Sequence, residues 1–139
     1  MDKPEKWPKG VPFTMDYPEI PVCALLDESA EKHPDATALI FQDKRITYRE
    51  LKDEVDRFAT ALQKMGVARK ERVALFLPNI PQFIISYYGA LKAGAIVTAI
   101  SPLYKEREVS HQIHDSGAET LVVLDLLYPE VENVMGELG

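Results

Sequence analysis

The sequence predicts an α/β fold built on a mainly parallel sheet with helices on both faces. Three observations lead to this prediction. Helix-type and strand-type segments alternate from residue 22 onward, which is the pattern of right-handed strand–helix–strand crossovers. Two strand-type segments, 72–77 and 95–100, are almost continuously apolar, as strands buried on both faces are. The 139 residues are 46% hydrophobic and 27% charged, an ordinary balance for a folded domain.

The composition excludes several classes of protein. A formal net charge of -6 predicts no basic surface for nucleic acid or an anionic membrane. The single cysteine, Cys23, cannot form an internal disulfide, and we expect a small buried hydrophobic residue there. No segment approaches the roughly 18–20 apolar residues that a membrane-spanning helix needs. No apolar run follows the lysines near the amino terminus, so we expect a cytoplasmic protein.

Residues 1–21 form a proline-rich segment, which we call the strap. Five of the ten prolines lie there. Proline has no N–H and restricts the residue before it, so the strap is expected to be irregular. Its apolar side chains would gain nothing in a free tail, so we expect the strap to lie on a folded body. A peptide-recognition segment is the alternative, but the strap has no PxxP pair with basic flanks. The apolar residues are Trp7, Val11, Phe13, Tyr17 and Ile20.

The α/β segment, residues 22–139, is predicted to open with a helix and a hairpin. Helical spacing begins at Val22, and His33-Pro34 ends that helix. Residues 36–41 have strand character and 45–47 can pair back across a polar turn.

Thr47 and Glu50 have the spacing of a capping box, which predicts the start of a second helix. Gly66 is expected to end this helix in a left-handed conformation. Asp53 and Arg57 are spaced to pair on its wet side. Its apolar face comprises Leu51, Val55, Phe58, Ala59, Leu62 and Met65.

Three further strands, 72–77, 95–100 and 119–124, alternate with helices in the second half of the chain. Asn79 is expected to cap the helix over 80–93, with Pro81 in its first turn. This helix is apolar nearly all round and therefore needs neighbours on both sides. Gly94 is expected to end it. Helices are also predicted over 105–115 and 126–138, the latter with Leu127, Val131, Val134 or Met135, and Leu138 in phase.

Ligands in such folds bind at the carboxyl ends of the strands, so the turns there are the candidate sites. Asn79, Ser101 and Asp125 lie in these turns. A capping or turn role is the commoner use of such residues. The seven glycines form neither a dinucleotide-binding nor a phosphate-loop motif. There is also no G-x-S-x-G sequence for a nucleophilic serine.

Two histidines suggest a metal site. His111 and His114 are spaced to share one helix face, with Asp115 adjacent, and three such ligands can hold a metal ion. An ordinary solvated face explains them equally well, as it does the paired carboxylates Asp53 and Glu54. The residues by themselves therefore identify no catalytic, cofactor-binding or metal-binding residue.

Four segments in register resemble a known family. Residues 46–51 read ITYREL, 72–79 read RVALFLPN, and 91–95 read LKAGA with Ser101-Pro102 at the expected distance. Residues 104–109 resemble the segment that follows, although Val109 stands where Leu or Ile is usual. These motifs, over about residues 22–125, resemble the adenylate-forming enzymes: acyl-CoA synthetases, firefly luciferase and peptide-synthetase adenylation domains.

The resemblance implies an incomplete part of the large N-terminal domain of the adenylate-forming fold. The parent enzyme would join a carboxylic acid, a long-chain or medium-chain fatty acid, to AMP and then to CoA. ATP, Mg and CoA are the implied cofactors, and a homodimer is a further candidate assembly. The family's ATP-phosphate loop and later motifs do not occur in residues 1–139. No functional residue is therefore carried over, and we expect the 139-residue chain alone to be inactive.

A stand-alone α/β binding or assembly module without catalysis is the alternative. Two features favour a truncated domain instead. The helix at 80–93 has more apolar surface than one sheet face can cover, and an amphipathic pattern is still running at Gly139.

Overall fold

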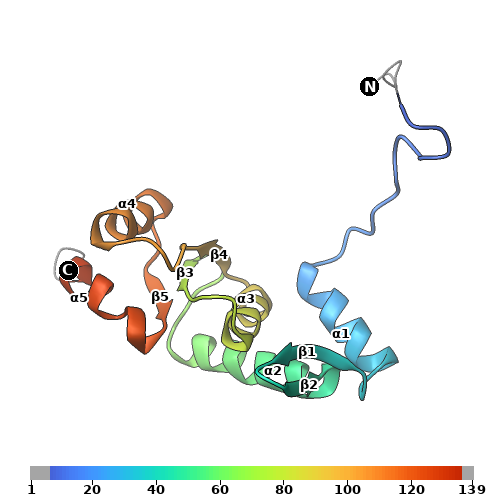
Figure 1. The fold of residues 1–139 in the computed structure, drawn as a ribbon, viewed down its shortest axis with the longest axis horizontal. Helices are drawn as coiled ribbons and strands as arrows, with labels where there is room; N and C mark the ends of the chain where they lie inside the picture. Colours follow the sequence, from blue (N-terminus) through green and yellow to red (C-terminus); the bar gives the residue numbers. More distant parts are fainter. Residues whose placement is uncertain (1–6, 136–139) are drawn as a thin grey trace.

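The computed structural model describes residues 7–135, without the side chains of Asn133 and Met135. It confirms the predicted α/β class with a parallel sheet. The strap extends away from a body in which helices cover both faces of the sheet (Figure 1). Leu138 of the last predicted helix lies outside the described residues. The elements are α1 (Val22–Lys32), β1 (Thr37–Phe41), β2 (Lys44–Thr47), α2 (Tyr48–Lys64), β3 (Arg72–Phe76), α3 (Pro81–Ala93), β4 (Ile96–Ala99), α4 (Glu106–Ser116), β5 (Thr120–Val123), a 3-10 turn (Asp125–Leu127) and α5 (Pro129–Met135).

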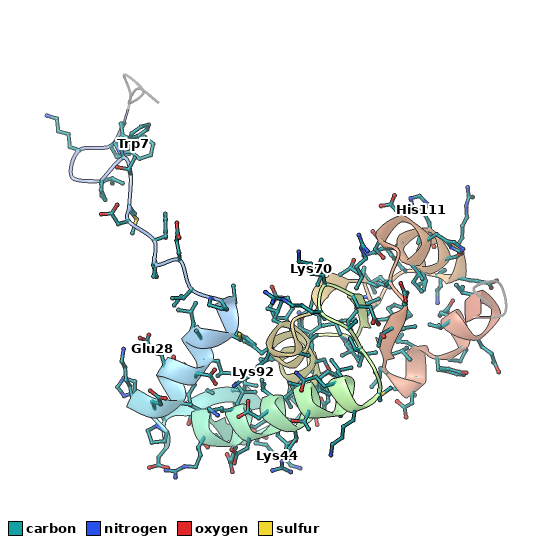
Figure 2. The ribbon with its side chains drawn as sticks, turned by 180° about the vertical axis from the view of Figure 1, so that it is seen from behind. Trp7, Glu28, Lys44, Lys70, Lys92 and His111 are labelled. Carbon is teal, nitrogen blue, oxygen red and sulfur yellow. The ribbon has the colours of Figure 1, made fainter. Side chains whose placement is uncertain are left out.

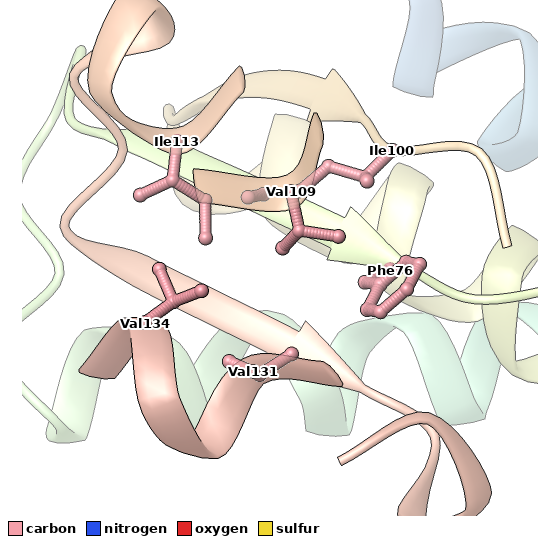
Figure 3. Close-up of a cluster of buried hydrophobic side chains, with 7 residues drawn as sticks. Phe76, Ile100, Val109, Ile113, Val131 and Val134 are labelled. Carbon is pink, nitrogen blue, oxygen red and sulfur yellow. The ribbon is translucent and has the colours of Figure 1, made fainter. Parts of the chain in front are cut away.

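Strand β3 is the centre of the sheet. It pairs in parallel with β4 on one side and with β5 on the other. Its residues 73–76 have no exposed surface, which confirms the predicted two-sided burial. Because side chains alternate along a strand, Ala74 and Phe76 face one apolar cluster while Val73 and Leu75 face another. The first cluster, shown in Figure 3, lies between the sheet and helices α4 and α5.

Strand β4 departs from its prediction. The apolar run at 95–100 predicts burial on both faces, but Ile96 is 49% exposed and Ala99 is also exposed. Within residues 7–135, β4 is an edge strand with β3 as its neighbour. An edge strand has less cover than a central one, whatever its hydrophobicity.

The hairpin and the start of α2 follow their local sequence signals. Gln42 and Asp43 adopt positive φ angles of 47° and 64°, as a two-residue hairpin turn requires. The Thr47 N–H donates to Glu50 Oε2 at 2.8 Å, and the Glu50 N–H donates to Thr47 Oγ1 at 3.2 Å. The predicted capping box is therefore confirmed.

Two details of α2 differ from the prediction. Leu51, Val55, Ala59 and Leu62 are buried, but Met65 is 75% exposed because the helix ends at this residue. Arg57 pairs at 3.5 Å with Glu54 rather than with Asp53, because the i,i+3 rotamer is as accessible as the i,i+4 one on an exposed face. Gly66 has φ 96°, as expected of a glycine that ends a helix.

Helix α3 begins at Pro81, one residue later than predicted. Ile80 is the N-cap residue and no side chain caps this end. The prediction that Asn79 caps α3 is therefore wrong, because Ile80 takes the extended conformation at the helix entrance and leaves Asn79 outside it. Gly94 ends the helix at φ 90°, as predicted.

The strap is irregular over residues 7–21, as predicted, but it does not lie on the body of this chain. Met15 is 60% exposed and Tyr17 is 76% exposed. Figures 1 and 2 show the strap projecting from the amino end of α1, with Trp7 near its far end. Cys23 is half-buried rather than buried, because it lies in the first turn of α1 where the strap gives no cover. No helix in the described part of the chain is long and apolar enough to cross a membrane.

Gly89 of α3 has no side chain, which allows α3 to pack closely against α2. A substitution at this residue therefore tests the packing of these two helices. A Cβ at residue 89 would lie 2.7 Å from Phe58 Cδ1 and 3.2 Å from the Val55 carbonyl oxygen. Alanine favours a helix over glycine by about 1 kcal/mol, but overpacking costs about 1–3 kcal/mol. We expect Gly89→Ala to lower the free energy of unfolding in urea by about 1 kcal/mol. A smaller loss is expected in a Phe58→Ala background. Equal or higher stability for Gly89→Ala would contradict this packing.

Candidate functional site

The carboxyl edge of the sheet is the place where a ligand site is expected. The turns after β3, β4 and β5 meet there because the three strands are parallel. Lys105 Nζ lies 2.5 Å from Glu130 Oε1 and joins the segment after β4 to α5. Two apolar side chains in these turns, Leu103 and Leu126, are 85% and 81% exposed. The described part of this edge therefore combines one ion pair with two exposed apolar side chains.

Two of the polar candidates at this edge form hydrogen bonds within their own turns. Ser101 Oγ accepts a hydrogen bond from the Leu103 N–H at 3.4 Å, and Asp125 Oδ1 accepts one from the Leu126 N–H at 2.9 Å. Asn79 is exposed and lines a cavity of about 220 Å³ between β1 and the start of α3. The structure does not bring these three side chains together as a polar site.

The histidine pair does not form a metal centre. His114 Nδ1 lies 2.8 Å from the Ser110 carbonyl oxygen of its own helix, while His111 lines an open groove with Asp115. No three His, Cys, Asp or Glu side chains within residues 7–135 are grouped closely enough to hold a metal ion. The metal hypothesis for His111 and His114 therefore gains no support from the geometry.

Sequence reasoning missed a group of four linked charges among residues 7–135. Lys92 Nζ of α3 lies 2.6 Å from Asp27 Oδ1 of α1 and 2.6 Å from Asp56 Oδ1 of α2. Lys52 Nζ completes the group at 2.6 Å from Asp56 Oδ2. We call these four residues the three-helix ion cluster; Figure 2 labels Lys92 where α3 passes α2. Asp56 Oδ1 is buried, forms no hydrogen bond of good geometry, and has the Lys92 ammonium group as its ionic partner.

The ion cluster shifts the pKa values of Asp56 and Lys92. Burial by itself would raise the pKa of Asp56, but the ammonium groups of Lys52 and Lys92 outweigh it and hold that pKa below its ordinary value. Burial would likewise lower the pKa of Lys92, yet Asp27 and Asp56 hold it above its ordinary value. Both shifts favour the charged forms of Asp56 and Lys92, so the cluster joins helices rather than exchanging protons.

One sequence signal points to the ion cluster. Lys92 is the single charged residue of α3, a helix that the sequence already requires to be covered on both sides. A charge on such a helix needs a counter-charge, because an unpaired buried charge is costly. The residues Asp27 and Asp56 that supply it are far away in sequence, so their identity follows only from the fold.

The profile of a family described as AMP-binding enzyme matches residues 26–138. This chain belongs to the AMP-binding enzyme family, as its motifs predict. It matches the N-terminal portion of the adenylate-forming fold.

Several relatives of this chain are long-chain-fatty-acid–CoA ligases. The chain is 38% identical over 125 residues to a long-chain-fatty-acid–CoA ligase of Bacillus subtilis, covering 90% of this chain and 22% of that protein. It is 33% identical to the corresponding ligase of Yersinia pestis, covering 94% of this chain and 24% of that protein. The chain thus spans less than a quarter of the length of these relatives.

Solved structures agree with the sequence relatives. The crystal structure of a long-chain-fatty-acid-CoA ligase from Archaeoglobus fulgidus superposes with a TM-score of 0.87 at 28% identity. The match covers 95% of this chain and 28% of that one. The anthranilate CoA ligase AuaEII, in complex with anthranoyl-AMP, gives a TM-score of 0.80 at 28% identity and covers 84% of this chain and 22% of its own.

The ion cluster is expected to stabilise the fold more than a surface ion pair does. Lys92→Met would leave two half-buried carboxylates facing each other, and hydrogen bonds to charged groups contribute about 1.5–3 kcal/mol. We expect a loss of about 2 kcal/mol in the free energy of unfolding in urea at neutral pH. The matched control is Lys32→Met, which removes an exposed 3.5 Å pair with Glu28 and should cost less than about 1 kcal/mol. Similar losses for both variants would contradict this role.

The lowered pKa of Asp56 predicts acid sensitivity. A carboxyl group with a lowered pKa in the folded state contributes stability above its unfolded pKa and loses it as pH falls through the folded value. The thermal unfolding midpoint of the unaltered chain should therefore decrease as the pH is lowered below about 4. Asp56→Asn removes this titration, so its midpoint should fall less over the same range. Asp53→Asn, at an exposed position on the same helix, should keep the original slope; identical slopes for all three proteins would disprove the assignment.

Proposed function

We propose that this chain is the N-terminal part of an ATP-dependent, AMP-forming acyl-CoA ligase for long-chain or medium-chain fatty acids. The observation that carries the proposal is the 38% identity to the Bacillus subtilis long-chain-fatty-acid–CoA ligase across 90% of this chain. The order of the motifs at 46–51, 72–79 and 91–95 supports it. In the reaction of the whole enzyme, the carboxylate and ATP give acyl-AMP and pyrophosphate, and CoA thiol then displaces AMP.

The described residues do not fit ATP or Mg. A phosphate site needs backbone N–H groups in a glycine-rich turn or a basic side chain. The turns after β3, β4 and β5 contain no glycine over 77–80, 100–104 and 124–128, and Lys105, which follows the second of them, is paired with Glu130. The oxygens of Ser101 and Asp125 accept hydrogen bonds from their own turns. We therefore propose that this part of the enzyme is a scaffold, inactive by itself, whose nucleotide, CoA and acyl sites require residues outside 1–139.

The domain organisation and location are part of the same proposal. Residues 1–21 would act as a separate strap and 22–139 as one part of the AMP-binding domain. The low cysteine content and the net charge of -6 support an enzyme of the cytoplasm that takes a small carboxylic acid and CoA rather than nucleic acid.

The proposal is tested by ATP–pyrophosphate exchange with palmitate, decanoate and anthranilate as substrates. We expect no exchange from the 139-residue chain and fatty-acid-dependent exchange from the product of the complete reading frame. Circular dichroism on the short chain checks that inactivity does not reflect unfolding. Exchange by the short chain would overturn the scaffold assignment, and a preference of the complete protein for anthranilate would overturn the substrate class. A stop codon directly after Gly139 would favour the stand-alone module.

A further inference from the structure

Helix α1 contacts the rest of the molecule at few points. Of its 11 residues, Leu26 and Ala30 are buried, whereas Val22 and Leu25 are each 48% exposed. Figure 1 shows α1 at one end of the body, with the strap leaving its amino end. A segment with few buried apolar contacts opens at a lower free energy than the core of a protein does. Helix α1 is therefore the described helix to examine for local opening.

The amino end of α1 has no anchor in the described chain. Its N-cap residue, Pro21, supplies no side-chain hydrogen bond, and the strap before it does not lie on the body. A helix satisfies most of its backbone N–H and C=O groups internally. Among residues 7–135, no backbone group of residues 22–32 forms a hydrogen bond with a residue beyond His33. Side chains alone therefore hold this helix to α2 and α3.

The chain that follows α1 is anchored, in contrast to its amino end. The Pro34 carbonyl oxygen accepts a hydrogen bond from the Arg49 N–H at 3.0 Å, and Asp35 Oδ1 lies 2.7 Å from Arg49 Nη2. Both contacts fasten residues 34–35 to the start of α2. His33, with φ -138° and ψ 55°, lies between this anchor and the helix. A hinge is a short segment of this kind, in which changes of φ and ψ turn one element away from another.

Asp27 makes the polar contact between α1 and the other helices. Its Oδ1 lies 2.6 Å from Lys92 Nζ and 3.9 Å from Lys52 Nζ. Among residues 7–135, no other side chain of α1 forms a hydrogen bond or ion pair with a different helix or strand. Loss of the Asp27 charge would leave Asp56 paired with both lysines. The ion pair between α2 and α3 therefore does not depend on α1.

Helix α1 covers an apolar surface of α2 and α3. Leu26 belongs to one cluster with Leu51 and Val55 of α2, and Ile84 and Tyr88 of α3 are partly buried against this cluster. Removal of α1 would return part of this surface to water, which is unfavourable. The closed form is therefore the major one, and an open form is a minor population in equilibrium with it.

We propose that α1 and the strap form one arm that detaches from α2 and α3 by local unfolding, with residues 33–34 as the hinge. Helices shorter than about 12–15 residues are marginal by themselves in water, so α1 loses its helical hydrogen bonds when the arm opens. The contact of Asp27 with Lys92 determines how often this happens. The open form presents Leu51 and Val55, which are 3% and 0% exposed in the closed form. The rest of the fold stays closed.

The test is hydrogen–deuterium exchange of the product of the complete reading frame, read by mass spectrometry. It resolves separate segments and does not depend on enzymatic activity. Relative to their intrinsic rates, the amides of residues 22–32 should exchange faster than those of residues 72–76 in β3. Asp27→Asn should accelerate exchange of 22–32 by about tenfold or more, as expected for the loss of a hydrogen bond between charged groups, and should leave 72–76 unchanged. Asp27→Glu, which keeps the carboxylate, should have a smaller effect.

The matched control is Glu28→Gln, which removes the same charge from the same helix but affects an exposed pair with Lys32 at 3.5 Å. It should change the exchange of residues 22–32 by less than about fivefold. Equal protection of 22–32 and 72–76 in the unaltered protein would overturn the proposal, because α1 would then open only when the whole domain unfolds. Equal acceleration of both segments by Asp27→Asn would also overturn it, as would equal effects of Asp27→Asn and Glu28→Gln.

Discussion

The burial of β3 on both faces and along both edges is the constraint on which the rest of the structure depends. The backbone N–H and C=O groups of this strand need partners, so the chain must return twice to place β4 and β5 beside it. Each return runs parallel to β3 and therefore requires a crossover helix. Its alternating side chains, Val73 and Leu75 against Ala74 and Phe76, require cover on both faces.

The three-helix ion cluster fixes the relative orientation of helices that otherwise pack through apolar contacts. Leu26, Leu51 and Val55 join α1 and α2 in an apolar cluster, and such contacts tolerate several orientations. Lys92 contacts carboxylates on two different helices, and charges that are partly removed from water tolerate less displacement. The cluster thus holds α1 against α2 and α3.

Local features were predictable because neighbouring residues decide them. The capping box at Thr47, the hairpin turn at 42–43 and the left-handed Gly94 depend on side chains and dihedral angles within a few residues. Several predictions that depend on neighbours in space were wrong. Met65 and Ile96 have the hydrophobicity of core residues but lie where the described chain gives no cover. Asn79 is a good capping residue that the chain leaves outside the helix entrance. The absence of family motifs for ATP could be read from residues 1–139, whereas the partners of Lys92 could not.

The sequence by itself determined the class of fold, the order of helices and strands and the family, because periodicity and short motifs are properties of adjacent residues. Only the tertiary structure decided that Asp27, Asp56 and Lys92 meet, that β4 is an edge strand among the described residues, and that the strap leaves its own body. Each of these depends on distances between segments that are remote along the chain. Such distances result from the sum of many weak contacts in the folded molecule, and no single pattern of residues encodes them.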